Sequence, residues 1–321
     1  MRVIRDNFTK IIKTPTVIVL GSFDGIHMGH RALIENAKKL VEQIKKNENV
    51  EDVKVMVCTF SNHPLSVINK GICPKLIMSN KEKRNLFKKL GVDILNFMGF
   101  NKDLMSISPD RFIESLKNCY NAKGIVVGFN YRFGYKNLGD VDFLKKSSET
   151  LEYELLVVDP VKVEDEVSSS SAIRHNIQEG NIEKANRFLT RPFMISGKII
   201  TGKQIGRTIE FPTVNLNYDK KYVIPKGGVY GTFVEYNGVL YKGITNVGYN
   251  PTIQGKKLSI ETHILNFNKT IYGEEIKLYF IEKIREEKKF IDIENLKSQL
   301  ILDKNYIYNQ NYSDYEENIL L

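Results

Sequence analysis

The sequence predicts an α/β protein with two domains: a doubly wound parallel sheet, then a small antiparallel β-barrel with a C-terminal helix. Three observations lead to this prediction. The length of 321 residues exceeds the usual size of one domain. Up to about residue 190, short apolar runs alternate with amphipathic helical stretches. Beyond that point, β-rich segments are separated by turn residues.

In the first half, alternation of strands and helices predicts parallel pairing, because parallel strands need a crossover between them. The expected strands are 16–20, 53–60, 92–97, 125–128 and 155–158, and the expected helices are 32–46, 80–90 and 109–118. Ligands of such sheets bind at the carboxyl ends of the strands. We therefore look for function in the loops that follow these strands.

The second half is expected to form the barrel from strands 193–200, 228–236, 239–247, 258–266 and 275–284, with a helix from 293 to 302 packed on it. A helical connector, 171–190, joins the halves, and Arg191-Pro192 would interrupt a continuing helix. We place the domain boundary inside this connector, giving domains 1–186 and 187–321.

Composition narrows the class of protein. A hydrophobic fraction of 42% and a charged fraction of 26% are typical of a globular chain, and no run of about 18 apolar residues could span a membrane. Three scattered cysteines without a CxxC pair suit a reducing compartment, so we expect a cytoplasmic protein. The net charge of +9 is dispersed among acidic residues, which makes nucleic acid an unlikely partner and favours anionic small molecules. We expect a monomer or weak homo-oligomer.

The loop after the first expected strand, GSFDGIHMGH at 21–30, carries the strongest chemical signal. Its glycines allow tight turns and close approach of a ligand, and the helix that follows offers unpaired N–H groups to phosphate. His27 and His30 can both donate hydrogen bonds to a phosphorus centre that gains negative charge. The alternatives are a glycine turn with incidental histidines, or a zinc site, for which no third ligand has suitable spacing.

Three later segments of the first half also follow expected strands or open a helix. They are TFSNHP at 59–64, GFNYRFG at 128–134 and SSSAIR at 169–174. Each has a plain structural alternative: the first suits a strand-ending turn, and the serines of the third suit a helix N-cap. As phosphate ligands, those serines would act with the neighbouring N–H groups and Arg174.

In the second half, a glycine-bearing loop at 197–207 precedes FPTVN at 211–215. Such a loop can fold over ATP phosphates, and the Thr213 hydroxyl and the Asn215 amide oxygen are hard donors suited to Mg²⁺. Downstream, Glu261 alternates with apolar neighbours in an expected strand. From the residues alone it is either a solvent-facing strand residue or a general base.

These motifs resemble one family in order and spacing. GSFDGIHMGH closely resembles the signature of HxGH nucleotidylyltransferases, in particular the FMN adenylyltransferase module of bacterial bifunctional riboflavin kinase/FAD synthetases. FPTVN resembles the riboflavin kinase signature, with Val214 in place of the usual alanine. The family-like motifs run from about Val17 to Asp303. The resemblance implies an N-terminal nucleotidylyltransferase domain and a C-terminal kinase barrel.

The resemblance also implies two reactions: ATP-dependent phosphorylation of riboflavin to FMN, and adenylylation of FMN to FAD with release of pyrophosphate. Both would use ATP and Mg²⁺. In the first domain His27 and His30 would be catalytic. The implied ATP contacts are Gly21, Phe23, Asp24, His27, Gly29, His30, Ser170, Ser171 and Arg174, and the implied flavin contacts are Asn62, His63, Pro64, Asn130 and Arg132.

In the second domain the resemblance implies that Glu261 is the general base for the ribityl 5′-hydroxyl. The implied ATP contacts are Gly202, Gly206, Arg207, Thr213 and Asn215, the implied Mg²⁺ ligands are Thr213 and Asn215, and the implied flavin contacts are Tyr249 and Arg285. Asn130, Asn250 and Asn266 depart from the family's common aspartate, arginine and aspartate. Two alternatives remain: another HxGH nucleotidylyltransferase with an accessory barrel, or a flavin- or RNA-binding protein without turnover.

Overall fold

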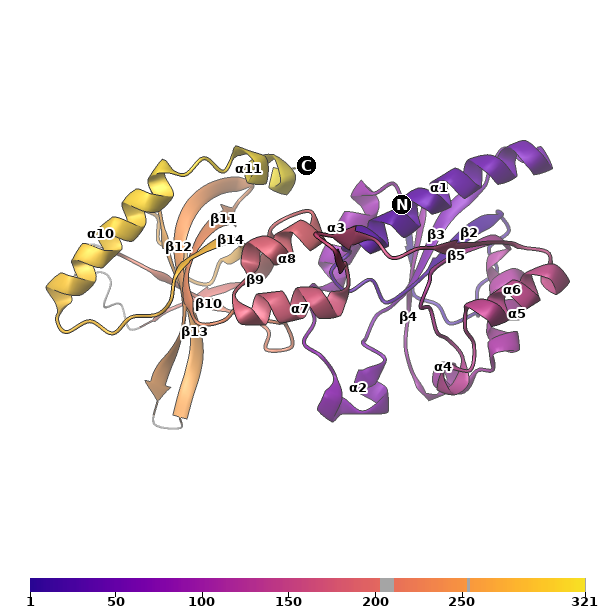
Figure 1. Cartoon of the computed structure of the whole chain (residues 1–321), viewed down its shortest axis with the longest axis horizontal. Coiled ribbons are helices and arrows are strands. Elements are labelled where there is room, and N and C mark those ends of the chain that lie inside the picture. The colour runs from indigo at the N-terminus through magenta and orange to yellow at the C-terminus, as the bar shows by residue number, and fades with distance from the viewer. Residues whose placement is uncertain (203–210, 253–254, 321) are drawn as a thin grey trace. The chain divides into compact units, whose positions relative to one another are not determined.

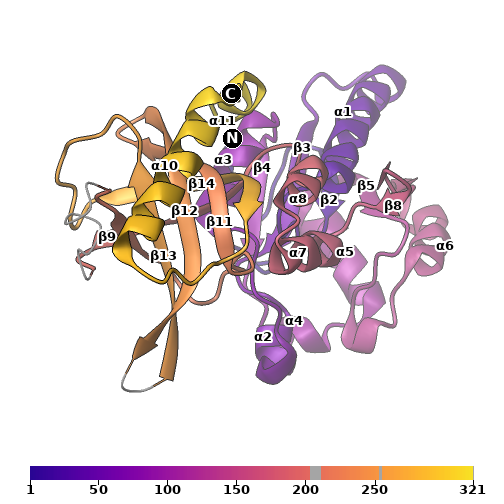
Figure 2. The ribbon, with the colours of Figure 1, turned by 60° about the vertical axis from the view of Figure 1, so that its left-hand side comes forward.

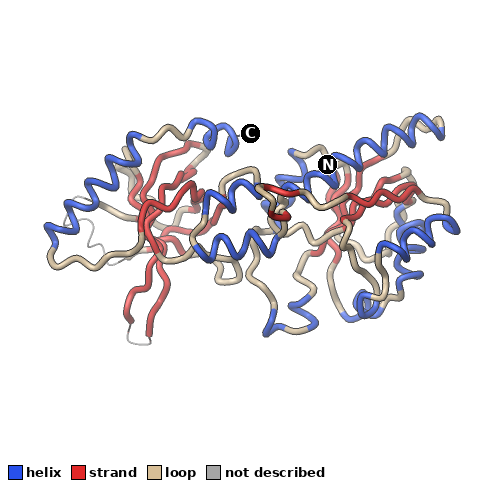
Figure 3. The backbone as a smooth tube through the Cα atoms, viewed as in Figure 1, coloured by secondary structure: helices blue, strands red, loops and turns tan. Residues whose placement is uncertain are grey.

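A computed structural model describes residues 1–202, 211–252 and 255–320, without the side chains of 249–257, 318 and 320. The chain forms two compact units (Figures 1 and 3). Unit 1 comprises residues 1–74 and 79–169, and unit 2 comprises residues 75–78 and 170–321. Within the described part of the chain, no helix has both the length and the apolar character needed to cross a membrane.

Unit 1 is built on a six-stranded parallel sheet in the order β1-β4-β3-β2-β5-β6, which confirms the predicted doubly wound sheet. Its strands are β1 (Arg2–Ile4), β2 (Thr16–Leu20), β3 (Lys54–Phe60), β4 (Ile94–Met98), β5 (Ala122–Gly128) and β6 (Glu154–Val158). The chain runs outward from β2 on one side, then returns to β5 on the other. The order therefore reverses beside β2, which is where open α/β sheets bind ligands.

Helices cover both faces of this sheet. Ile18 and Leu20 of β2 pack in one core cluster with Phe112 of α5. On the opposite face, Gly124 of β5 leaves room for Leu40 and Ile44 of α1, because a Cβ there would lie 2.9 Å from the Leu40 side chain. The helices are α1 (Met28–Glu48), α2 (Leu65–Ile68), α3 (Asn80–Lys89), α4 (Lys102–Ser106), α5 (Pro109–Tyr120) and α6 (Val141–Leu151).

Unit 2 contains a closed antiparallel barrel in the order β10-β13-β12-β11-β14-β9, as predicted (Figure 2). Its strands are β9 (Phe193–Ile200), β10 (Val214–Asn217), β11 (Gly228–Tyr236), β12 (Val239–Thr252), β13 (Gly255–Ile264) and β14 (Glu275–Arg285). β13 ends at Ile264 and not at Asn266 as predicted, because Asn266 adopts a left-handed φ of 56°.

In the part of unit 2 that the structure describes, the helices are α7 (Ser170–Glu179), α8 (Ile182–Leu189), α10 (Ile293–Asn309) and α11 (Ser313–Leu320). The last two cover the outside of the barrel, where Ile307 and Tyr312 pack on Phe233. Lys242 of β12 fixes the end of α10 by donating to the carbonyl oxygens of residues 307, 308 and 310. Such carbonyls lack partners within the helix itself.

Candidate active sites

The GSFDGIHMGH loop lies at the carboxyl end of β2, where the strand order reverses. Phe23 and Ile26 adopt left-handed φ angles of 52° and 43°, as does Gly25 at 94°. Such angles are unusual for non-glycine residues and for a β-branched one above all, so surrounding contacts must hold the loop in this form. Asp24 is 2% exposed and Phe23 is fully buried, which makes the loop part of the unit's core.

The two histidines lie together at the start of α1. Their ring centroids are 3.7 Å apart, and the ring of Phe23 lies 4.8 Å from that of His30. Gly29 allows this packing, because a Cβ there would lie 3.2 Å from the ring of His27. His27 is the N-cap residue of α1, so both rings stand where the first N–H groups of the helix point outward. The arrangement brings together two imidazoles and a helix N-terminus, the groups that bind phosphate.

Sequence reasoning missed Ser168, which belongs to this site, and the buried Arg31, which follows the histidine pair in the chain. The Ser168 hydroxyl lies 3.3 Å from Nδ1 of His27, and its residue is buried. Only its place in a serine run beside the helix start could have suggested it. Arg31 follows His30 directly, and its Nε is buried without a hydrogen-bond partner in the described part of the chain. Burial lowers the pKa of its guanidinium. The Ser168 contact adds a hydroxyl to the histidine pair.

The predicted flavin segment at 62–64 follows β3, one strand away from the loop. Its Asn62 side chain donates to the Phe100 carbonyl oxygen at 3.0 Å and accepts from the Phe100 amide at 2.9 Å. His63 Nδ1 accepts from the amide of Leu65, and Pro64 is the residue at the N-cap position of the short helix α2. The segment is therefore ordered by its own contacts at the same sheet edge as the loop. Contact with flavin stays a prediction for all three residues.

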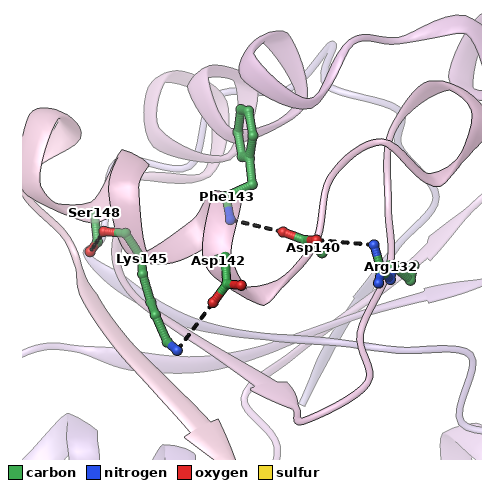
Figure 4. Close-up of polar contacts among 6 residues, drawn as sticks. All are labelled: Arg132, Asp140, Asp142, Phe143, Lys145 and Ser148. Atoms are coloured by element: carbon green, nitrogen blue, oxygen red, sulfur yellow. Dashed lines mark hydrogen bonds and ion pairs between the residues drawn. The ribbon is translucent and has the colours of Figure 1, made fainter.

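The segment at 128–134 follows β5, on the other side of β2. Arg132 is exposed and forms an ion pair of 3.0 Å with Asp140, which also accepts from the amide of Phe143 and so caps α6 (Figure 4). The amide hydrogen bond and Arg132 hold the pKa of Asp140 below its usual value. Asn130 is exposed in the turn before Arg132. Their contact with flavin stays a prediction.

Ser170 and Ser171 open α7, and Arg174 lies one turn later on the same helix. All three belong to unit 2, whereas the histidine loop belongs to unit 1. Their role as ATP contacts stays a prediction.

In the barrel, three polar residues of adjacent strands form one line, which we call the Asn–Glu–Asn row: Asn215 of β10, Glu261 of β13 and Asn246 of β12. Glu261 pairs directly with both asparagines in the strand register. Directly opposite residues point to the same face of a sheet, with Cβ atoms about 5 Å apart. The neighbours of Glu261 in the chain, Ile260 and Thr262, are each 1% exposed and point to the other face of the sheet, into the barrel. Asn246 was missed by sequence reasoning.

Residues that precede Asn215 in the chain contact the strands that carry the Asn–Glu–Asn row. Gly202 leaves space for Asn215, because a Cβ at Gly202 would lie 2.1 Å from the amide nitrogen of Asn215. The Pro212 carbonyl oxygen lies 2.9 Å from Nδ1 of His263, and the rings of Phe211 and His263 are 5.2 Å apart. Burial lowers the pKa of His263, and the carbonyl oxygen can only accept, so Nδ1 carries the proton. Thr213 follows Pro212 directly and lies two residues before Asn215 of the row.

Four predicted kinase contacts remain: Gly206, Arg207, Tyr249 and Arg285. Gly206 and Arg207 lie outside the described residues, and Tyr249 is described only by its backbone in β12, opposite Leu258. Arg285 is paired with Asp303 of α10: Nε donates to both carboxylate oxygens at 3.1 Å and Nη2 to one at 2.8 Å. The flavin role of Arg285 stays a prediction, beside this structural one.

Comparison with known proteins finds relatives for both halves of the chain. The FAD synthetase family model matches residues 9–172, and the riboflavin kinase family model matches residues 189–310. Bifunctional riboflavin kinase/FMN adenylyltransferases are similar along most of the chain. The one from Bacillus subtilis is 35% identical over 295 residues, 90% of each chain, and that from Listeria monocytogenes is 36% identical over 303 residues, 93% of this chain and 92% of the relative. The chain belongs to this family.

A solved structure shows that the likeness of this bifunctional riboflavin kinase/FMN adenylyltransferase family member to known proteins includes the fold. A crystal structure named as a macrolide-efflux protein from Streptococcus pneumoniae has a TM-score of 0.86 and 31% identity, covering 97% of this chain and 100% of that one. The name belongs to that protein, and the fold is what the two chains share. The predicted family is thus confirmed. The two family models leave residues 173–188 between them, and the predicted domain boundary at 186 stays a prediction within that interval.

Proposed function

We propose that unit 2 phosphorylates riboflavin to FMN and that unit 1 adenylylates FMN to FAD, each with ATP. The Asn–Glu–Asn row carries the kinase assignment, since its carboxylate can accept the proton of a hydroxyl and its amides offer hydrogen-bonding groups on either side. The adjacent histidines at the start of α1 support the transferase assignment. Family members from Bacillus subtilis and Listeria monocytogenes are named for both activities.

In the transferase step, an oxygen of the FMN phosphate attacks the α-phosphorus of ATP. A new P–O bond forms, the bond from the α-phosphorus to the bridging oxygen breaks, and pyrophosphate leaves. His27 and His30 donate hydrogen bonds to phosphate oxygens as their negative charge grows, and the first N–H groups of α1 do the same. Catalysis is positioning and charge stabilisation, without a covalent enzyme intermediate.

In the kinase step, Glu261 accepts the proton of the ribityl 5′-hydroxyl while that oxygen bonds to the γ-phosphorus, and ADP leaves. Thr213 and Asn215 would hold Mg²⁺. Their hydroxyl and amide oxygens suit that ion, and Asn215 stands directly opposite Glu261 in the strand register. When bound, the ion supplies positive charge to the phosphates. Asn246, on the other side of Glu261, offers an amide to orient the carboxylate or the hydroxyl.

We also infer a cytoplasmic enzyme, a monomer or weak homo-oligomer, whose partners are these small molecules. The three free cysteines support a reducing compartment. Chemical cross-linking of the purified enzyme tests the oligomeric state. A stable assembly larger than a dimer would contradict it.

Two variants test the assignment of one reaction to each unit. Glu261→Gln removes the base and keeps the shape, so FMN formation from riboflavin is expected to stop while FAD formation from supplied FMN continues. His30→Ala is expected to show the reverse. Products are separated by chromatography after incubation with ATP and Mg²⁺. A wild-type protein that makes neither FMN nor FAD contradicts the proposal, and one that makes FMN without FAD points to a different acceptor in unit 1.

A further inference from the structure

One face of α3 packs against the GSFDGIHMGH loop at 21–30, the histidine loop. α3 begins with a capping box between Ser79 and Glu82, which fixes its first turn. Two side chains one turn apart, Lys83 and Phe87, are its buried residues. Lys83 is 7% exposed, which is rare for lysine and requires compensation, since burying a charge without a partner is costly.

The two buried side chains of α3 contact successive residues of the loop. The Lys83 ammonium donates to the Ser22 carbonyl oxygen at 2.8 Å, and the hydroxyl of Thr59 donates to the same oxygen at 2.9 Å. Phe87 packs edge-on against Phe23, with ring centroids 5.3 Å apart. Phe23 in turn contacts His30, whose ring centroid lies 3.7 Å from that of His27. A continuous line of contacts therefore joins α3 to both histidines.

The backbone of the loop explains why such support is needed. Ser22 immediately precedes Phe23, whose left-handed φ of 52° sets the direction of its ring, and Ile26 repeats the left-handed geometry before His27. Conformations of this kind are strained and persist only where the surroundings hold them. A hydrogen bond from a charged donor is roughly twice as strong as one from a neutral donor. The Lys83 ammonium is the charged donor on the carbonyl that precedes the strained residue.

We propose that Lys83 is a positioning residue of the adenylyl-transfer site: its ammonium holds the Ser22 carbonyl, offsets the charge of buried Asp24, and so keeps Phe23 and the two histidines in place. The inference rests on the proposed function of unit 1. Lys83 acts through the loop and through no contact with the reacting atoms.

The charge on Lys83 makes this role dependent on pH. Burial lowers the pKa of Lys83 from 10.5 to about 8, and the charge of Asp24 opposes that shift. The other titratable groups of the loop are His27 and His30, and on α3 Glu82 is engaged in the cap while Arg84 is exposed. Above pH 8 the ammonium loses its proton in the folded state, so its bond to Ser22 weakens and Asp24 loses its counter-charge. Adenylylation is therefore expected to fall with rising pH.

Stability changes in the opposite direction, which separates the two effects. In the unfolded chain the lysine keeps its usual pKa, so between about pH 8 and pH 10.5 the unfolded state binds more protons than the folded one. The Lys83 contribution therefore raises the free energy of unfolding as pH rises through this window. A loss of adenylylation there cannot be assigned to unfolding caused by Lys83.

The experiment compares Lys83→Met, Lys83→Arg and the matched control Lys88→Met, an exposed lysine on the same helix. Lys83→Met is expected to lower kcat for FMN adenylylation by about 10- to 100-fold and to leave riboflavin phosphorylation in unit 2 unchanged. Lys83→Arg keeps its charge at high pH, so it is expected to lose the decline above pH 8 that the wild type shows. The imidazole NMR resonances of His27 and His30 are expected to move in Lys83→Met and to stay in Lys88→Met.

Three results would overturn the inference. They are a Lys83→Met enzyme with wild-type kcat, a Lys83→Arg enzyme with the wild-type decline at high pH, and imidazole resonances that respond equally to Lys83→Met and Lys88→Met. If Lys83→Met fails to fold, as melting would show, the wild-type and Lys83→Arg pH profiles still decide. A wild type that makes no FAD at pH 7 contradicts the function proposed for unit 1 instead, and the imidazole resonances then test the positioning role without turnover.

Discussion

Gly202 offers a sharp test of the kinase site, because a single methyl group there meets a candidate Mg²⁺ ligand. In Gly202→Ala the new Cβ would lie 2.1 Å from the amide nitrogen and 2.7 Å from Cγ of Asn215. Ordinary contact begins at 3.4 Å, so the amide must retreat by more than about 1 Å. A displacement of about 1 Å at a positioning group can cost about 100-fold in rate, or about 2.7 kcal/mol.

The assay measures kcat/KM for riboflavin phosphorylation and, separately, FAD formation from FMN. We expect Gly202→Ala to lower the first by about 100-fold and to leave the second unchanged. In an Asn215→Ala background the same substitution is expected to cost little, because the displaced amide is already gone. Gly99→Ala is the control, since a Cβ there meets nothing within 4 Å. A Gly202→Ala enzyme within about threefold of wild type, or an equal loss in both backgrounds, would refute the reasoning.

Two further predictions concern contacts within one unit. Ser168→Ala removes the hydroxyl beside Nδ1 of His27. It is expected to slow FMN adenylylation by about tenfold, equivalent to about 1.4 kcal/mol, and to leave riboflavin phosphorylation unchanged. A variant that adenylylates FMN at the wild-type rate would show that Ser168 does not orient His27. Asp303→Asn leaves the Arg285 guanidinium, whose side chain is 13% exposed, without its carboxylate and is expected to destabilise unit 2 by about 3 kcal/mol in urea unfolding. A change below about 0.5 kcal/mol would mean that the pair contributes little.

The sequence predicted the sheet and the barrel because their strands carry strong local signals. The period-two pattern around Glu261 and the apolar run of β2 each specify a strand. β1 and β10 were not predicted because each is short. β1 has three residues and β10 has four, too few to show the alternation of apolar and polar residues that is typical of a strand. β10 was also hidden in the FPTVN motif, whose residues drew attention for their side chains.

The residues of the sites divide in a similar way. His27, His30 and Glu261 stand in local patterns that the chain displays directly. Ser168, Asn246 and Lys83 do not, because each reaches its site through strand pairing or packing across long sequence separations: 141 residues from Ser168 to His27, and 61 from Lys83 to Ser22. Lys83 in particular lies on a helix whose other lysines are exposed, and nothing in the sequence pattern distinguishes it from them.

The alternation along β13 ties catalysis to the way the barrel is assembled. Ile260 and Thr262 point into the barrel, where Thr262 shares a hydrogen bond of 2.9 Å with Thr245. Glu261, between them, points outward. A slip of one residue in the pairing of β13 would exchange these roles, turning the carboxylate into the apolar interior and two core residues outward. Kinase turnover therefore reports whether β13 has paired in the correct register. During refolding, a barrel that becomes compact but does not regain kinase turnover would be detectable as misregistered.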